Sequence, residues 1–213
     1  MKPAALAGLA AVALAAGLAG YWLSVRGTEP AAVAVPAERG RQIPAELPDF
    51  TLADAAGQPR SIREWSGSSL IINFWATWCP PCRRELPLLN ALHAEHADEG
   101  FQVIGVAVDF REDVLAFMEE TPIDYPMLIG EQDGLDAARA FGMENLGFPF
   151  TVFTDRRGRV VTVHVGELHA PQAEAILSAI ARLDAGGGTL EDARREIESG
   201  LAALRAEKDP KAS

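Results

Sequence analysis

The sequence contains only two cysteines in 213 residues, and both lie in the run Trp78-Cys79-Pro80-Pro81-Cys82. A zinc site takes about four ligands, and no other cysteine is present to supply a second pair. Among the four histidines, only His93 and His96 lie close together. They follow Cys82 by more than two turns of an expected helix, too far along it to share a metal with Cys79. We therefore expect no metal site, and the single close pair of cysteines becomes the main candidate for chemistry.

Positive charge is also scarce. The chain has 19 Lys and Arg against 30 Asp and Glu, which gives a formal net charge of −11. Such a balance argues against nucleic acid and against an anionic membrane surface as partners. It names no positive partner, because solubility alone explains an acidic surface.

Charged residues are absent from Pro3 to Val25, a stretch of about 23 mostly apolar residues that is long enough to cross a bilayer. Residues 1–27 are thus a signal anchor or a cleaved signal peptide. The anchor is favoured, because the apolar core exceeds a typical signal peptide and only Ala32-Val33-Ala34 resembles a cleavage site. We expect a domain held at the inner membrane and facing the periplasm or the outside, with secretion after cleavage as the alternative. Disulfides persist in either compartment.

The remaining chain divides into a proline- and alanine-rich linker (28–45), a domain (46–184) and a C-terminal helical appendage (185–213). Apolar runs and turn residues predict a mixed sheet flanked by helices. Thr189 and Asp192 are placed to cap a last helix, whose narrow apolar stripe predicts loose packing on the domain. The expected strands are 49–52, 57–62, 70–75, 101–108, 125–129, 150–154 and 159–165, and the expected helices are 81–97, 111–120, 134–141 and 171–183.

The cysteine pair lies between a buried strand and a helix. At a helix N-terminus, unpaired N–H groups and the positive end of the dipole favour a thiolate, which is the nucleophile of disulfide exchange. Pro81 suits the first helical turn, where an N–H is not needed. Cys82 lies one turn deeper, where it can resolve a mixed disulfide. A purely structural bridge is the weaker interpretation, because so small a loop gains little from chain entropy.

Residues 46–184 resemble the thioredoxin-like thiol–disulfide proteins of the TlpA, ResA and CcmG type. The resemblance implies an α/β thioredoxin-like fold and a thiol:disulfide oxidoreductase that needs no organic cofactor. Its partners would be protein disulfide substrates and an upstream dithiol donor, as in a reductase for cytochrome c maturation. The matching segments are Asn73 to Pro87 with the motif Trp78-Cys79-Pro80-Pro81-Cys82, the opening Leu47 to Leu52, the segment Gly147 to Phe153, and an insert between Phe101 and Gly130.

Within this resemblance, Cys79 is the exposed attacking thiol and Cys82 the resolving thiol, joined as a disulfide when oxidised. Glu85 corresponds to an acidic residue beside the active site. The alternative for Glu85 is an exposed helix residue that balances Arg83 and Arg84. Asn73 stands where ordinary thioredoxin has a buried acid, so Glu85 would have to replace it.

Four further residues are expected to bind substrate: Trp78, Pro80, Phe148 and Pro149. The resemblance implies a cis peptide at Pro149 facing the cysteines, and backbone hydrogen bonds from Phe148 to an extended substrate. Without it, Pro149 would be an ordinary proline at the start of a strand. Trp75 is expected in the core and Trp78 at the rim of the site.

Two other families have related folds. Peroxiredoxins share the opening hairpin, but the chain lacks the PxxxTxxC motif of their peroxidatic cysteine. Copper chaperones with a thioredoxin fold use two cysteines separated by three residues together with a distant histidine. His164 keeps a copper-binding role open as the alternative function.

Overall fold

The computed structural model describes residues 43–143 and 147–208. The predicted membrane segment 3–25 and most of the predicted linker lie outside this part of the chain. Among the residues described, none of the helices has both the length and the apolar character needed to traverse a lipid bilayer.

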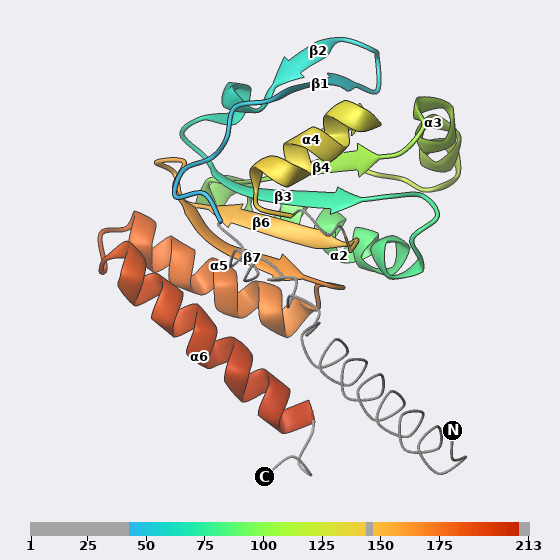
Figure 1. Cartoon of the computed structure of the whole chain (residues 1–213). Helices are drawn as coiled ribbons and strands as arrows, with labels where there is room; N and C mark the ends of the chain where they lie inside the picture. The colour runs from blue at the N-terminus through green and yellow to red at the C-terminus, as the bar shows by residue number, and fades with distance from the viewer. Residues whose placement is uncertain (1–42, 144–146, 209–213) are drawn as a thin grey trace, which may run out of the picture. The chain divides into compact units, whose positions relative to one another are not determined.

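The centre of the domain is a seven-stranded sheet with the order β2-β1-β5-β4-β3-β6-β7 (Figure 1). The inner strands β3, β4 and β5 run parallel, and the remaining pairs are antiparallel. The predicted mixed sheet is therefore confirmed. The strands are β1 (Thr51–Asp54), β2 (Pro59–Ser61), β3 (Ser69–Trp75), β4 (Phe101–Val108), β5 (Met127–Gly130), β6 (Phe150–Thr154) and β7 (Val160–Val165).

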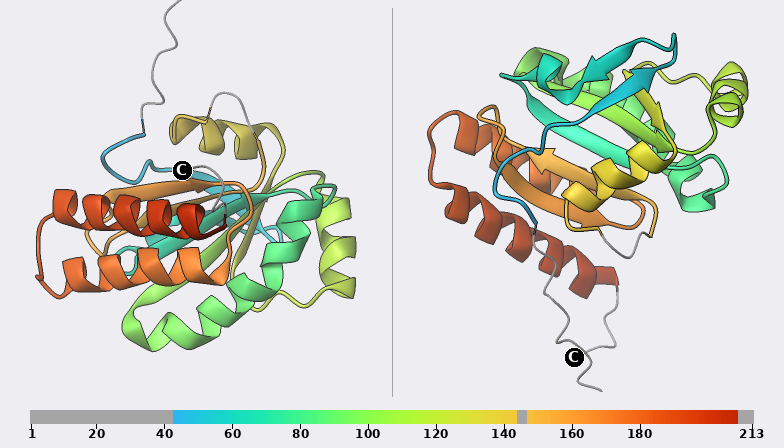
Figure 2. Two further views of the ribbon diagram at one scale, coloured as in Figure 1. Left: turned by 90° about the horizontal axis from the view of Figure 1, so that it is seen from below. Right: turned by 45° about the horizontal axis from the view of Figure 1, so that its top comes forward.

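Helices cover both faces of the sheet, as Figure 2 shows. One hydrophobic cluster unites α2, α3, α5 and α6 with one face, and a second unites α4 with the other. Two buried faces explain why β3 and β4 consist of continuous apolar runs rather than alternating residues. The helices are α2 (Pro80–His96), α3 (Arg111–Glu120), α4 (Gln132–Ala140), α5 (Ala170–Asp184) and α6 (Leu190–Lys208), with short 3₁₀ helices η1 (Ile62–Trp65) and η2 (Ala97–Glu99).

The boundaries differ from expectation by a few residues where a local constraint intervenes. The sequence predicts a strand from Tyr125, but β5 begins at Met127. Pro126 has no N–H to donate to the sheet, and only its carbonyl takes part, by accepting from the Gly105 N–H at 2.9 Å. The strand therefore starts after the proline.

The C-terminal helix packs more tightly than its narrow apolar stripe predicts. The predicted cap is confirmed, since the Thr189 hydroxyl accepts from the Asp192 N–H at 3.2 Å. Ala193 and Ile197 are buried in the same hydrophobic cluster as the inner face of α2. The Arg194 guanidinium also donates to the carbonyls of Val160 and Val161 in β7, at 2.8 and 3.2 Å. The expectation of a loosely packed appendage is thus wrong: α6 lies beside α5 and covers part of β7 (Figures 1 and 2).

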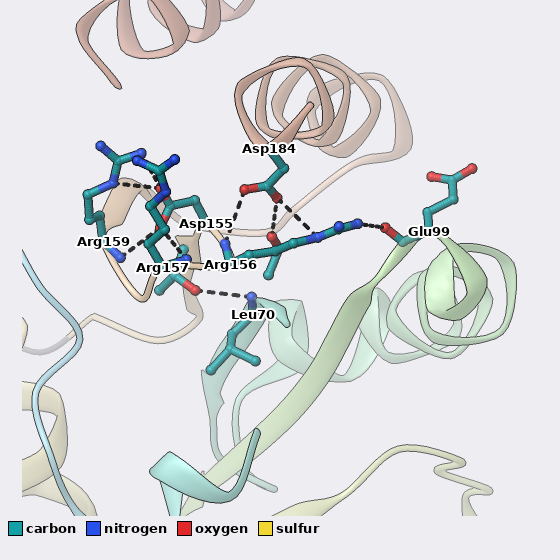
Figure 3. Close-up of polar contacts among 9 residues, drawn as sticks. Leu70, Glu99, Asp155, Arg156, Arg157, Arg159 and Asp184 are labelled. Carbon is teal, nitrogen blue, oxygen red and sulfur yellow. Dashed lines mark hydrogen bonds and ion pairs between the residues drawn. The ribbon is translucent and has the colours of Figure 1, made fainter. Parts of the chain in front are cut away.

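A polar cluster braces the end of the sheet opposite the cysteines (Figure 3). Asp184, at the end of α5, accepts from the Ser69 hydroxyl at 2.5 Å and from the Arg156 N–H at 3.2 Å. Asp155 is fully buried and accepts from the N–H groups of Arg157 and Arg159 at 3.1 and 2.8 Å. These bonds fix the β6–β7 turn against the start of β3.

The other end of the sheet is where the motif lies. The parallel pairing of β3 with β4 runs as far as Trp75 opposite Ala107, and β6 begins with Phe150 opposite Phe74. The carboxyl ends of parallel strands commonly form binding crevices in α/β proteins. The cysteine loop, the β4–α3 loop and the Phe148–Pro149 segment therefore meet at one edge.

Candidate active site

Cys79 and Cys82 are joined by a disulfide that spans the start of α2, with their Cα atoms 5.3 Å apart. Cys79 is the N-cap residue of this helix, and its sulfur accepts from the Cys82 N–H at 3.3 Å. Pro80 and Pro81 occupy the first helical positions, where a missing N–H costs nothing. In the reduced state the same helix start favours negative charge on Cys79.

The two cysteines differ little in accessibility. Cys79 is 3% exposed and Cys82 is fully buried. The expectation of an exposed Cys79 does not hold in this disulfide state, because both cysteines belong to the hydrophobic cluster beneath α2. Cys79 nevertheless keeps the only accessible surface of the pair, in keeping with the order of roles predicted from the sequence.

Glu85 is buried one turn beyond Cys82, at 1% exposure. Its carboxylate accepts from the Leu168 N–H and from the Asn73 side-chain amide, both at 2.7 Å. Burial raises the pKa of Glu85 from 4.5 to about 7; the two hydrogen bonds oppose this rise and the charge of Glu167 adds to it. A carboxyl group with such a pKa exchanges protons near neutral pH.

The alternative of an exposed Glu85 that balances the neighbouring arginines is wrong. Arg84 pairs with Glu167 at 2.5 Å, and the Arg83 guanidinium lies over the Phe117 ring at 5.4 Å. The sequence pattern around the cysteines did not identify the partners that hold Glu85, because these come from β3 and from the segment before α5.

Asn73 links this carboxylate to the sheet. Its amide nitrogen also donates to the Thr151 hydroxyl at 3.0 Å, and the two residues face each other across β3 and β6. The Asn73 carbonyl oxygen and the Tyr125 hydroxyl are buried without a hydrogen-bond partner in the described part of the chain. Sequence reasoning missed Thr151, which only the strand register could have placed beside Asn73.

The segment before β6 supplies the second wall of the site. The Phe148–Pro149 peptide is cis, as predicted, and the Pro149 carbonyl accepts from the Gly166 N–H at 2.8 Å. The Phe148 ring meets the Trp78 ring edge-on, with centroids 6.1 Å apart. Trp78 is 66% exposed and Trp75 is fully buried, which confirms the predicted positions of the two tryptophans. Pro80 is exposed beside them.

Asp109 ties a third loop to the cysteines, and sequence reasoning missed it. Its carboxylate accepts from the N–H and the hydroxyl of Thr77, at 3.0 and 2.6 Å. Asp109 directly follows β4 and Thr77 directly precedes Trp78, so this pair joins the β4–α3 loop to the cysteine loop. An acidic residue at the end of a parallel strand next to the motif strand was the available signal.

His164, the candidate copper ligand, lies in β7 and is largely buried, and its Nε2 is 3.3 Å from the Glu167 carbonyl. Burial lowers the pKa of His164. Within residues 43–143 and 147–208, no three His, Cys, Asp or Glu side chains gather in a way that could hold a metal ion. The copper-binding alternative stays a hypothesis.

Comparison with known proteins agrees with this geometry. The family model described as the AhpC/TSA family matches residues 43–163. The thiol-disulfide oxidoreductase ResA of Halalkalibacterium halodurans is 32% identical over 62% of this chain and 73% of its own length. The thioredoxin-like protein YneN of Bacillus subtilis is also 32% identical, over 64% of this chain and 79% of its own.

Solved structures give the same result. A thiol:disulfide interchange protein DsbE from Chlorobium tepidum aligns with a TM-score of 0.58 at 28% identity, over 67% of this chain and 96% of its own. A secreted thiol-disulfide isomerase from Corynebacterium glutamicum aligns with a TM-score of 0.57 at 26% identity, over 65% and 84%. Together with the Cys79–Cys82 disulfide, these matches show that the chain belongs to the AhpC/TSA family and is a thioredoxin-like thiol:disulfide oxidoreductase of the ResA and DsbE type.

Proposed function

We propose that this protein is an extracytoplasmic reductase of protein disulfides, in which Cys79 attacks, Cys82 resolves and Glu85 transfers the proton. The observation that carries the proposal is the disulfide at the start of α2 with a buried carboxyl group one turn away, whose pKa is near neutrality. Electrons come from an upstream dithiol protein, so the reaction uses no organic cofactor.

The first step is attack by the Cys79 thiolate on a disulfide of the substrate protein. A bond forms between Cys79 Sγ and one substrate sulfur, the substrate disulfide breaks, and the other substrate sulfur leaves as a thiolate that takes up a proton. In this proposal Trp78, Pro80 and the Phe148–Pro149 segment bind the substrate beside the attacking sulfur, and the contact between the Trp78 and Phe148 rings supports their common role. Phe148 offers backbone hydrogen bonds to an extended substrate segment, which aligns the substrate sulfur for attack.

The second step is resolution by Cys82. Its thiol must lose a proton before its sulfur bonds to Cys79 Sγ and displaces the substrate sulfur held there, which leaves as a thiolate and takes up a proton; Cys82 itself has no access to solvent in this structure. Glu85 is the buried base one turn along the same helix, and it is about half ionised at neutral pH. The products are a substrate dithiol and the Cys79–Cys82 disulfide, which is the state of this structure.

The proposed location rests on the apolar segment from Pro3 to Val25, which would anchor the domain to the inner membrane. Secretion after cleavage is the alternative. Such a reductase would supply dithiols to proteins whose cysteines must be free outside the cytoplasm, and the maturation of cytochrome c is the example that the family resemblance implies.

A trapping experiment tests the proposal. In Cys82→Ala the mixed disulfide cannot be resolved, so we expect the substrate to remain covalently attached to Cys79 and to be released by dithiothreitol. Cys79→Ala is the matched control and should trap nothing. Recovery of equal adducts from both variants would contradict the assigned roles.

The direction of electron flow is tested by equilibration with glutathione buffers. A reductase should require a more reducing buffer than the glutathione pool of its compartment to open the Cys79–Cys82 disulfide. A half-reduced point at oxidising ratios of glutathione would instead indicate an oxidase of protein thiols.

A further inference from the structure

Two polar side-chain atoms are fully buried without a hydrogen-bond partner in residues 43–143 and 147–208. They are the carbonyl oxygen of Asn73 and the hydroxyl oxygen of Tyr125. A buried polar atom of this kind loses its hydrogen bonds to water and gains none in return, so such atoms are rare in folded proteins. The reaction proposed above gives neither atom a role.

The sheet brings these two atoms to the same region beneath α2. Asn73 in β3 lies directly opposite Gly105 in β4. The Tyr125 ring packs on this glycine, because a Cβ atom at position 105 would lie 3.0 Å from Tyr125 Cε2. Cε2 is the ring atom next to the carbon that bears the hydroxyl. The glycine therefore lets the hydroxyl end of Tyr125 approach the sheet beside Asn73.

Glu85 is the third member of this group. The Asn73 amide nitrogen donates to the Glu85 carboxylate at 2.7 Å and to the Thr151 hydroxyl at 3.0 Å, which leaves the Asn73 oxygen for another donor. Burial raises the pKa of the Tyr125 hydroxyl, and the charge of Glu85 raises it further. This hydroxyl thus keeps its proton in the neutral range and can donate it to a hydrogen bond.

We propose that Tyr125 is a positioning residue for Glu85. Its hydroxyl donates through one bridging water to the Asn73 carbonyl oxygen, which keeps the Asn73 amide nitrogen turned toward the Glu85 carboxylate. A single water is the expected link between two buried groups that make no direct bond, and internal waters commonly join atoms of this kind. Tyr125 also lines an open surface pocket with Met118 and Pro126, which gives water a way in.

The orientation of the Asn73 amide decides which form of Glu85 it favours. With its nitrogen toward Glu85, the amide donates to the carboxylate and opposes the effect of burial. Turned over, the amide would offer its oxygen to Glu85 and would favour the protonated carboxyl group. A donor on the Asn73 oxygen therefore stabilises the ionised Glu85, the form that accepts the proton of Cys82. Only this last step rests on the proposed function.

Other titratable groups face the pair from the elements packed against it. On α2, Cys79–Cys82 carries no charge in the disulfide state, and the His93 ring meets the Tyr125 ring edge-on, with centroids 6.3 Å apart. In the segment before α5, the charge of Glu167 raises the pKa of Glu85. Tyr125→Phe leaves all these groups in place, so this substitution isolates the hydroxyl.

The experiment is a carbon-13 NMR titration of the Glu85 carboxyl group in the oxidised full chain. In Tyr125→Phe the Asn73 oxygen loses its donor, so the titration midpoint of Glu85 should rise by about 0.5–1 pH unit, the equivalent of one hydrogen bond. Met118→Leu changes the same pocket without removing a hydrogen-bonding hydroxyl, and this matched control should keep the wild-type midpoint. Tyr125→Phe should fold, because it only removes a buried hydroxyl that makes no direct bond in the described part of the chain.

A second variant tests the route of this effect. In Asn73→Ala the link is already broken, so adding Tyr125→Phe should shift the midpoint of Glu85 no further. The positioning role is overturned if Tyr125→Phe leaves the midpoint unchanged or lowers it. It is also overturned if the full shift persists in the Asn73→Ala background, because the effect would then bypass the amide.

The pH dependence of disulfide exchange separates this inference from the proposed function. If Glu85 accepts the proton of Cys82, the rise of the exchange rate with pH should move upward in Tyr125→Phe by the same amount as the carboxyl titration. A shifted titration with an unshifted rate profile supports the positioning role and contradicts the role of Glu85 as the base. A shifted rate profile with an unchanged titration overturns the positioning role.

Discussion

Glu85→Gln removes the charge of the buried carboxyl group and retains its shape. The hydrogen bonds around position 85 can adjust to this change. The Asn73 carbonyl oxygen has no partner among the described residues, and a rotation of the Asn73 amide lets it accept from the new glutamine N–H. The Leu168 N–H keeps an oxygen to donate to. We therefore expect Glu85→Gln to fold and to retain the Cys79–Cys82 disulfide.

The magnitude follows from the raised pKa of Glu85, about 7 in the folded protein against 4.5 ordinarily. Between these values the folded state holds a proton that the unfolded chain has released, so the free energy of unfolding falls as the pH rises. The stabilisation that comes from this bound proton is fully present below about pH 4 and is lost above pH 7. It contributes about 3 kcal/mol to the free energy of unfolding. Glu85→Gln has no such pH dependence at this position. As the pH rises from 4.5 to 8, its free energy of unfolding should therefore increase by about 3 kcal/mol relative to that of wild type.

Urea unfolding of the oxidised proteins between pH 4.5 and pH 8 measures this difference. Glu174→Gln makes the same substitution at an exposed position of α5 and is the control, which should follow the wild-type profile. If the wild-type and Glu85→Gln profiles run parallel with a constant offset, the carboxyl group is not protonated by burial and the argument fails.

The same substitution bears on the redox chemistry. A carboxylate near Cys82 opposes a second negative charge, so its removal should lower the pKa of at least one cysteine. It should also slow exchange at neutral pH, because Cys82 loses the group that accepts its proton. A rise in the thiolate fraction together with a fall in turnover is a combination that a structural defect alone would not produce.

The remaining predictions concern the cysteines, the polar brace and the last helix. In the reduced protein Cys79 should alkylate much faster than Cys82, with a pKa below the free value of roughly 8.5, and stopped-flow alkylation with mass analysis would expose equal rates. Asp155→Ala removes three hydrogen bonds from a buried carboxylate and should lower the free energy of unfolding by about 3 kcal/mol in urea, whereas a loss near zero would contradict its bracing role. Ile197→Ala should cost about 3 kcal/mol in the same assay, and a cost below about 1 kcal/mol would restore the expectation of a loosely packed helix.

The local features of the fold were predictable because their causes are local. An apolar run followed by Cys-Pro-Pro-Cys indicates a strand that leads into a helix start, and β3 and α2 occupy these positions. The tryptophans divided as expected, since Trp75 continues the buried strand and Trp78 lies outside it. The cis peptide before Pro149 was different: the residues alone indicate an ordinary strand-start proline, and only the family resemblance implied the cis form.

The surroundings of Glu85 were not predictable, because they depend on contacts between distant parts of the chain. Its backbone donor, Leu168, lies 83 positions away, and the Asn73 amide that donates to it is also held by Thr151, 78 positions from Asn73. An isolated sequence pattern left Glu85 equally compatible with an exposed helix surface. Tertiary packing alone buries it, and burial is the cause of its raised pKa.

Hydrogen bonds fix the backbone on each side of the cysteines and leave the neighbouring apolar side chains free. Thr77 is bonded to Asp109, which places the chain immediately before Trp78 and Phe110. Gly166 is bonded to Pro149, which places the chain beside Phe148 and Val165. A substrate that docks on such a surface orders few protein groups, so more of the apolar contact energy remains for binding. The same bonds thus fix the loops that carry the reacting sulfur, Trp78 and Phe148, which explains why residues far apart in the sequence meet at this one edge of the sheet.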